Sequence, residues 1–125
     1  GPPPRTWIPS IPDEKLKGEV RRTMRDWGNE ILQGDYPLDN RWAQTFAVLM
    51  YCRMLHSLAT GEVQSKPAGA AWAKVTVGRT WTALIDDAMS ARSGQYTKVS
   101  QPSDPEKVKL TKAFIVFALS EVGQI

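Results

Sequence analysis

Two aspartates with the spacing of one helical turn are well suited to hold a cationic ligand. Asp35 and Asp39 lie four positions apart, across the expected start of a helix that runs from about Asp39 to Thr60. One turn of helix would put both on the same side, where two carboxylates can bind ammonium or guanidinium groups. The alternative interpretation is structural, with Asp39 capping the helix and Asp35 lying in the preceding loop.

A lysine at the start of another expected helix is a candidate for binding an anion. Ser65 is a good N-cap residue, Pro67 fits the first helical turn, and Lys66 lies between them. A helix N-terminus favours anions, and the lysine adds a full positive charge, so a phosphate group could bind here. A capped surface helix without a ligand is the alternative.

Arg53 and His56 lie in the most apolar part of the sequence, FAVLMYCRMLH. In such surroundings Arg53 is expected to have a carboxylate or carbonyl partner. A histidine in this setting is more often structural than catalytic. Helical RNA-cleaving toxins need a wider spacing between an arginine and a histidine, so this pair argues against that class.

The composition excludes several kinds of active site. There is one cysteine and one histidine, which rules out a disulfide framework, a Cys-based zinc site and any catalysis that needs two histidines. The sequence has no Walker A pattern, no GxGxxG and no carboxylate cluster after a Gly-Ser loop. The chain alone is therefore not expected to be an enzyme or to contain catalytic residues.

Charge and hydropathy restrict the partners of the chain. The net charge is only +3, and the densest basic run, residues 15–25, is interleaved with acidic residues. This pattern is typical of a solvated helix face, so no nucleic-acid partner is expected. No apolar run approaches the ~20 residues of a membrane span, and the N-terminus lacks a signal-peptide pattern. We therefore expect no membrane contact and a cytoplasmic location.

The elements that must position these residues are all expected to be helices. Apolar residues recur at steps of three and four, and no segment alternates with the period of a strand. The expected fold is all-α, with about five helices in an up-down bundle and an extended Pro-rich arm over residues 1–12. The helices are expected to begin near Asp13, Asp39, Ser65, Thr80 and Ser103.

Several signals predict where these helices begin, end and lie. Gly34 and Gly61 are natural stops for the first two helices. Ser103 and Glu106 fit a capping box for the last helix, after a polar loop over residues 93–102. The helix containing FAVLMYC is apolar all round, which predicts that it is the central and most buried one.

The segment CRMLHSLATGEVQSKPAGAAWA, residues 52–73, resembles a block of the streptomycin/spectinomycin adenylyltransferase family. Gly1-Pro2 and the later IPDEKL also resemble the entry into that family's helical domain, although Gly1-Pro2 could instead be a scar of tag cleavage. The resemblance covers nearly the whole chain and implies a C-terminal helical domain over residues 13–125. The matching positions are Arg53, Thr60, Gly61, Ser65, Lys66, Ala70, Ala71, Trp72 and Ala73.

The resemblance also implies an activity, transfer of AMP from ATP to an aminoglycoside hydroxyl, which gives antibiotic resistance. In this family an N-terminal nucleotidyltransferase domain carries the magnesium-binding aspartates and the catalytic base. That domain would precede residue 1, so this chain alone is expected to be inactive, and ATP and Mg²⁺ would be held mainly by the missing domain. The helical domain lends acidic residues to the antibiotic and a lysine to the ATP phosphates, which implies roles for Asp35, Asp39 and Lys66.

Two departures from the family pattern leave alternatives open. Counting back from Arg53 without a gap puts the acidic pair on Asp39 and Ala43, and only a four-residue insertion puts it on Asp35 and Asp39. The family's nucleotide-contacting tyrosine falls at Arg92, where arginine could still contact phosphate. The alternative function is a stand-alone helical ligand-binding or protein-interaction module without catalysis.

Overall fold

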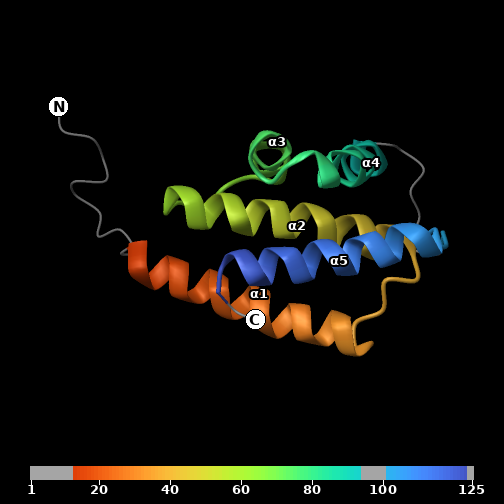
Figure 1. Ribbon diagram of the computed structural model, residues 1–125, viewed down its shortest axis with the longest axis horizontal. Coiled ribbons are helices and arrows are strands. Elements are labelled where there is room, and N and C mark those ends of the chain that lie inside the picture. The colour runs from red at the N-terminus through yellow and green to blue at the C-terminus, as the bar shows by residue number, and fades with distance from the viewer. Residues whose placement is uncertain (1–12, 94–100, 124–125) are drawn as a thin grey trace.

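The computed structural model describes residues 13–93 and 101–123, and these residues form five α-helices and one short 3₁₀ helix (Figure 1). Among them there is no β-strand, which confirms the predicted all-α bundle. None of the described helices is long and apolar enough to cross a bilayer. The Pro-rich arm over residues 1–12 and most of the loop over residues 93–102 lie outside the described residues. The helices are α1 (Asp13–Gln33), α2 (Arg41–Thr60), α3 (Lys66–Thr76), η2 (Arg79–Trp81), α4 (Thr82–Ser93) and α5 (Pro105–Glu121).

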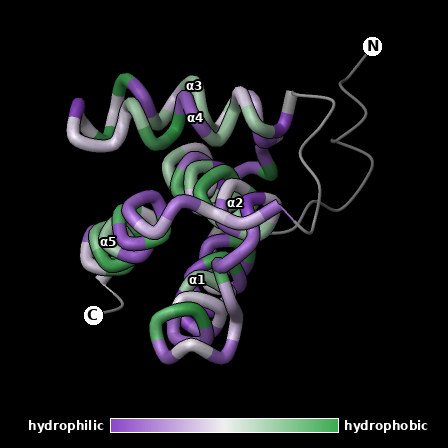
Figure 2. Tube along the Cα trace, turned by 90° about the vertical axis from the view of Figure 1, so that its right-hand side faces the viewer, coloured by the Kyte–Doolittle hydropathy of each residue, from purple (hydrophilic) through white to green (hydrophobic). Residues whose placement is uncertain are grey.

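The helices form two layers that cross each other. In Figure 1, α1, α2 and α5 run along the long axis of the molecule, whereas α3 and α4 are seen end-on. The view turned by 90° shows α3 and α4 along their length, lying across α2 (Figure 2). Only α1, α2 and α5 therefore keep the up-down arrangement, and α2 packs against all four other α-helices.

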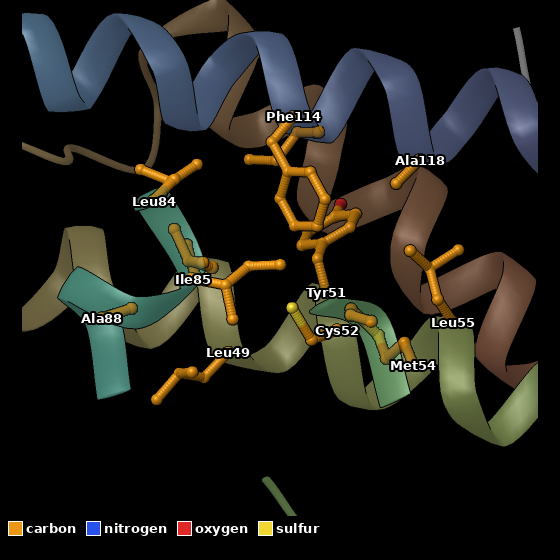
Figure 3. Packing of buried hydrophobic residues seen from close by; sticks show 14 of the residues in the cluster. Leu49, Tyr51, Cys52, Met54, Leu55, Leu84, Ile85, Ala88, Phe114 and Ala118 are labelled. Atoms are coloured by element: carbon orange, nitrogen blue, oxygen red, sulfur yellow. The ribbon is translucent and has the colours of Figure 1, made fainter. Parts of the chain in front are cut away.

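The central helix α2 is buried along most of its length, as its apolar sequence predicts. Tyr51 and Cys52 are fully buried, and Leu49 is 1 % exposed. Figure 3 shows how Leu84 and Ile85 of α4 and other buried side chains from neighbouring helices surround these residues. Burial raises the pKa of Cys52 to about 12, so its thiol remains protonated and unreactive.

A glycine allows α1 and α2 to pack through a hydrogen bond. The Tyr51 hydroxyl donates to the backbone carbonyl oxygen of Met24 over 2.5 Å. A Cβ atom at Gly28 would lie 2.6 Å from that hydroxyl oxygen. The absence of a side chain at Gly28 therefore gives the tyrosine access to the α1 backbone, and burial raises the pKa of Tyr51.

A second glycine allows α3 to pack directly on the backbone of α2. A Cβ atom at Gly69 would lie 2.7 Å from the Cα atom of Arg53 and 2.8 Å from its backbone nitrogen. As predicted, Ser65 caps α3, since its hydroxyl accepts a hydrogen bond from the Ala68 backbone nitrogen over 3.2 Å. The cap fixes where α3 begins, and Gly69 fixes how closely it approaches α2.

The predicted caps of two other helices are wrong. Asn40, rather than Asp39, caps α2, and its side-chain oxygen accepts from the Ala43 backbone nitrogen over 2.7 Å. Asp104, rather than Ser103, caps α5. The reason is a short pairing of residues 38–41 with residues 101–103, in which the Ser103 hydroxyl donates to the backbone carbonyl of Leu38.

An aspartate on α4 ties three helices together. The carboxylate of Asp87 accepts two hydrogen bonds from the Arg41 guanidinium, 3.0 and 3.2 Å long, and one from the Lys107 ammonium, 2.8 Å long. Arg41 lies on α2 and Lys107 on α5. Burial alone would raise the pKa of Asp87, but the hydrogen bonds and charges of these two cations hold it below its usual value.

Replacing Gly69 by alanine should destabilise the fold, although alanine is the better helix former. The added methyl group would press on backbone atoms of α2 that cannot move aside, at an expected cost of ~1–3 kcal/mol. The matched control is Gly18→Ala in α1, where an added Cβ atom would have nothing within 4 Å. This substitution should raise the free energy of unfolding by ~0.5–1 kcal/mol. Urea unfolding followed by circular dichroism measures both, and a stabilised Gly69→Ala variant would contradict the close packing.

Asp87→Asn should lower the free energy of unfolding by ~1–3 kcal/mol near neutral pH, because it leaves two partly buried cations unpaired. Asp86→Asn is the control, since the ion pair of Asp86 with Lys74 is more exposed and should contribute under ~1 kcal/mol.

The contribution of Asp87 to stability should depend on pH. Its pKa in the folded state is depressed, so its contribution is complete above the pKa of the unfolded state, ~3.9, and is lost as the pH falls through the folded pKa. Unfolding curves from pH 7 to pH 2 should therefore converge for the wild type and Asp87→Asn; a constant gap would contradict the assignment.

Candidate functional site

Two of the residues singled out in the sequence, Lys66 and Arg92, meet over the same aromatic ring. The Lys66 ammonium lies 5.4 Å from the centroid of the Phe46 ring, and the guanidinium carbon of Arg92 lies 5.9 Å from it. Arg92 also lies 5.2 Å from the centroid of the Trp42 ring. The two cations, from α3 and α4, line one cavity of about 250 Å³, together with Leu49, Pro67 and Met89.

The aromatic rings belong to the stripe of α2 that its neighbours leave partly open. Between residues 42 and 53 most side chains of α2 are buried, and the half-buried ones recur at steps of four, four and three, which is one helical face. These are Trp42, Phe46, Met50 and Arg53. Trp42 and Phe46 receive the cations from α3 and α4, whereas Met50 and Arg53 line a cavity with α1.

The surrounding structure fixes each of the two cations in a different way. Lys66 is the first residue of α3, whose position is set by the Ser65 cap and by the close approach at Gly69. Arg92 lies in the last turn of α4, just over one turn beyond Asp87. Because Asp87 is bonded to Arg41 at the start of α2, the salt bridge also holds the Arg92 turn close to Trp42.

Neither Lys66 nor Arg92 forms an ion pair with any carboxylate in the part of the chain that the structure describes. Other cations nearby are neutralised, for example Arg41 and Lys107 by Asp87, and Lys74 by Asp86. The cavity is therefore lined by two positive charges that the described residues do not neutralise. Such a pair can donate charge-assisted hydrogen bonds to an anion with several oxygen atoms, such as a phosphate chain.

The structure changes the basis for pairing Asp35 with Asp39. Because α2 begins at Arg41, both aspartates lie in the non-helical segment that follows α1, and the argument from helical spacing is wrong. Asp35 is an exposed turn residue whose backbone nitrogen donates to the carbonyl oxygen of Glu30 over 2.8 Å. The structure does not bring the two carboxylates onto one helical face.

Asp39 nevertheless remains an available carboxylate. Its side chain is exposed, and among the described residues it has no hydrogen-bond or ion-pair partner. Its backbone oxygen accepts from the Ser103 nitrogen over 2.9 Å, which fixes its position beside α5. Asp39 lines a cavity of about 340 Å³, and Lys112, which also lines it, adds a positive charge there. The other candidate for the second acidic position, Ala43, is only 5 % exposed and belongs to the core.

Arg53 and His56 do not form a site with the residues above. Arg53 lines a separate cavity of about 300 Å³ between α1 and α2. The expected carboxylate or carbonyl partner of Arg53 is not found among the residues described. The His56 ring stacks on Trp72 at 5.2 Å between centroids, which supports a structural role for this histidine. No group of histidine, cysteine and acidic residues in the described ranges could hold a metal ion.

The sequence did not indicate the roles of Trp42, Phe46 and Asp87. The first two match an apolar helical stripe of the kind that usually belongs to a core, and nothing local in the sequence predicts which cations lie over them. Asp87 lies in a short helix and gains its partners through contacts 46 and 20 positions away. The spacing of four between Trp42 and Phe46 is the one signal that could have suggested stacked rings on a single face.

Comparison with curated proteins and with solved structures gives no significant match to this chain. One family model does match, described as the aminoglycoside adenylyltransferase C-terminal domain, and it spans residues 6–116. That range includes all five α-helices apart from the last residues of α5, and it contains both Lys66 and Arg92. The helical fold, the block at residues 52–73 and this match agree. The chain belongs to the family of aminoglycoside adenylyltransferase C-terminal domains.

Proposed function

We propose that this chain is the substrate- and ATP-contacting helical domain of a nucleotidyltransferase that transfers AMP from ATP to a hydroxyl group of an aminoglycoside. The observation that supports this most strongly is the convergence of Lys66 and Arg92, both without ion pairs among the described residues, on one cavity. The family's activity supplies the reaction type. An N-terminal nucleotidyltransferase domain would provide the ligands for Mg²⁺ and the catalytic base.

The chemistry of AMP transfer explains why two cations would serve this domain. The aminoglycoside hydroxyl would lose its proton to the catalytic base of the N-terminal domain as its oxygen attacks the α-phosphorus of ATP. The bond to the oxygen that bridges to the β-phosphate breaks, which releases pyrophosphate. Negative charge therefore grows on the leaving group in the transition state. Positive groups that are already in place stabilise this charge without having to reorganise. Lys66 and Arg92 would have this role, and Mg²⁺ held by the N-terminal domain would supply further positive charge.

Asp39 is the proposed contact for the antibiotic. An aminoglycoside carries several ammonium groups, and an exposed carboxylate without a partner in the described chain can bind one of them. Asp35 would add a second, weaker contact from the neighbouring turn, because its side chain is exposed to water. The charge of Lys112 in the same cavity opposes a polycation, so it would weaken rather than strengthen drug binding.

Lys66→Ala and Arg92→Ala should each weaken ATP binding by ~1–3 kcal/mol in the full-length protein that carries this chain, because each removes a charged hydrogen bond to phosphate. Titration calorimetry with ATP and Mg²⁺ measures the loss, and aminoglycoside affinity should stay nearly constant. Lys74→Ala is the control, since this lysine lies on the same helix but pairs with Asp86. If both substitutions at the cavity leave ATP affinity unchanged, the phosphate site is wrongly assigned and the non-catalytic binding module becomes the better interpretation.

Asp39→Asn should weaken aminoglycoside binding by ~1–3 kcal/mol and affect ATP binding much less, because it removes a charge-assisted hydrogen bond to the drug. Asp26→Asn provides a control at another exposed aspartate, which lies on α1. Lys112→Gln should have the opposite effect and strengthen aminoglycoside binding at low ionic strength, because it removes a positive charge from the same cavity. Equal losses of drug and ATP affinity in Asp39→Asn would indicate a structural role instead.

A further inference from the structure

We propose that Phe46 and Trp42 are positioning residues, whose stacked rings hold Lys66 and Arg92 together over one cavity before a phosphate chain binds. This inference rests on the proposed function, because it explains how the phosphate-binding cations keep their places. It adds two aromatic residues that do not themselves contact the reacting atoms. We call the pair of rings the aromatic platform.

The geometry of the aromatic platform is that of a cation–π site with two occupants. The Trp42 and Phe46 rings stack with 4.9 Å between centroids and only 11° between planes, so each ring holds the other in place. Arg92 lies over both rings and Lys66 over the Phe46 ring, all within 6 Å of the centroids. Distances of this size give attraction between a cation and the negative face of a ring.

The two cations need such support because they repel each other and have long side chains. Both charges lie within 6 Å of the Phe46 centroid, and no carboxylate among the described residues separates or neutralises them. Lysine and arginine each have considerable rotamer entropy, which is lost when an anion fixes them. Contacts that restrict the side chains beforehand reduce this cost at the moment of binding.

An aromatic ring suits this task better than an acidic residue would. A carboxylate would hold both cations strongly, but it would also neutralise them and compete with phosphate for the same hydrogen bonds. A ring attracts a cation through its quadrupole and accepts none of its conventional hydrogen bonds. The platform therefore keeps the two charges in place and leaves their N–H groups free for an anion.

The platform itself is fixed by α1. The Trp27 ring packs edge-on against Phe46 at 5.9 Å, and on its other side it stacks on the buried Tyr51 ring at 5.7 Å. Phe46 is therefore held by a rigid neighbour, although its own ring is half-buried. This chain of contacts connects the core between α1 and α2 to the position of the two cations.

The test compares Phe46→Leu, which removes the ring but keeps an apolar side chain, with Phe46→Tyr, which keeps the ring. In the full-length protein, Phe46→Leu should weaken the binding of both ATP and inorganic tripolyphosphate by about three- to tenfold. Phe46→Tyr should keep both affinities close to those of the wild type. Phe117→Leu is the matched control. Its half-buried ring packs on Trp81 and Phe114 rather than under a cation, so both affinities should change by less than about twofold.

A double-mutant cycle separates a cation–π role from general loosening of the fold. In a Lys66→Met background, Phe46→Leu should have a clearly smaller effect on tripolyphosphate affinity than in the wild type, because one of the cations that it positions is already gone. Trp42→Leu should likewise lose most of its effect in an Arg92→Met background. Full additivity in both cycles would overturn the proposal.

The possible failures can be told apart. If Lys66→Ala and Arg92→Ala weaken ATP binding but Phe46→Leu does not, the proposed function stands and the platform is wrong. If Phe46→Leu weakens the binding of ATP but not of tripolyphosphate, Phe46 contacts the adenine base of ATP directly, and the positioning role is overturned. If none of the three variants changes either affinity, the proposed function itself fails, and the positioning role fails with it.

A spectroscopic readout tests the platform without any ligand. Protons of a lysine side chain held over a ring face are shifted upfield by the ring current in proton NMR spectra. The ε-methylene protons of Lys66 should show such a shift in the wild type and in Phe46→Tyr, and should lose it in Phe46→Leu. An unchanged shift in Phe46→Leu would overturn the proposal.

Discussion

The burial of α2 is the constraint on which the rest of the structure depends. An apolar helix of this length needs cover on nearly every side, and four other helices provide it in two crossing layers (Figures 1 and 2). Close cover is possible because Gly28 and Gly69 let α1 and α3 approach α2 without a side chain between them. Between residues 42 and 53, only the stripe that carries Trp42 and Phe46 stays partly open. The candidate site thus lies on a face of the central helix that packing leaves partly open.

Electrostatics near this stripe are arranged in two different ways. Asp87 binds two cations strongly and uses their charges to join α2, α4 and α5. A short distance along α4, Arg92 lies over aromatic rings and keeps its charge unneutralised by the described residues. The first arrangement gives stability, and the second gives a place for an anion. The proposed function needs both arrangements, and the Asp87 salt bridge connects them, because it holds α4 against α2 and α5.

The sequence predicts the elements of this fold better than their ends and contacts. The helix stops at Gly34 and Gly61 and the Ser65 cap depend on local backbone chemistry, and the structure confirms them. The predicted caps at Asp39 and Ser103 are wrong, because the pairing of residues 38–41 with 101–103 is a contact between distant segments.

The same division between local and distant contacts holds for the site. Lys66 and Arg92 could be singled out from a family resemblance, but no local pattern shows that they meet over Phe46. That meeting follows from the angle at which α3 and α4 cross α2, and side-chain packing between distant segments determines the angle. Asp39 and Asp35 show the converse. Their spacing suggested a helical pair, and the late start of α2 at Arg41 removes that argument.

The central claim is that Lys66 and Arg92 together form the face of this domain that receives the phosphates of ATP. A crystal structure of the full-length protein with a non-hydrolysable ATP analogue, Mg²⁺ and an aminoglycoside tests it most directly. The account predicts phosphate oxygens within about 3.2 Å of both the Lys66 ammonium and the Arg92 guanidinium, with both cations still over the aromatic rings. A nucleotide whose phosphates contact neither residue would contradict it.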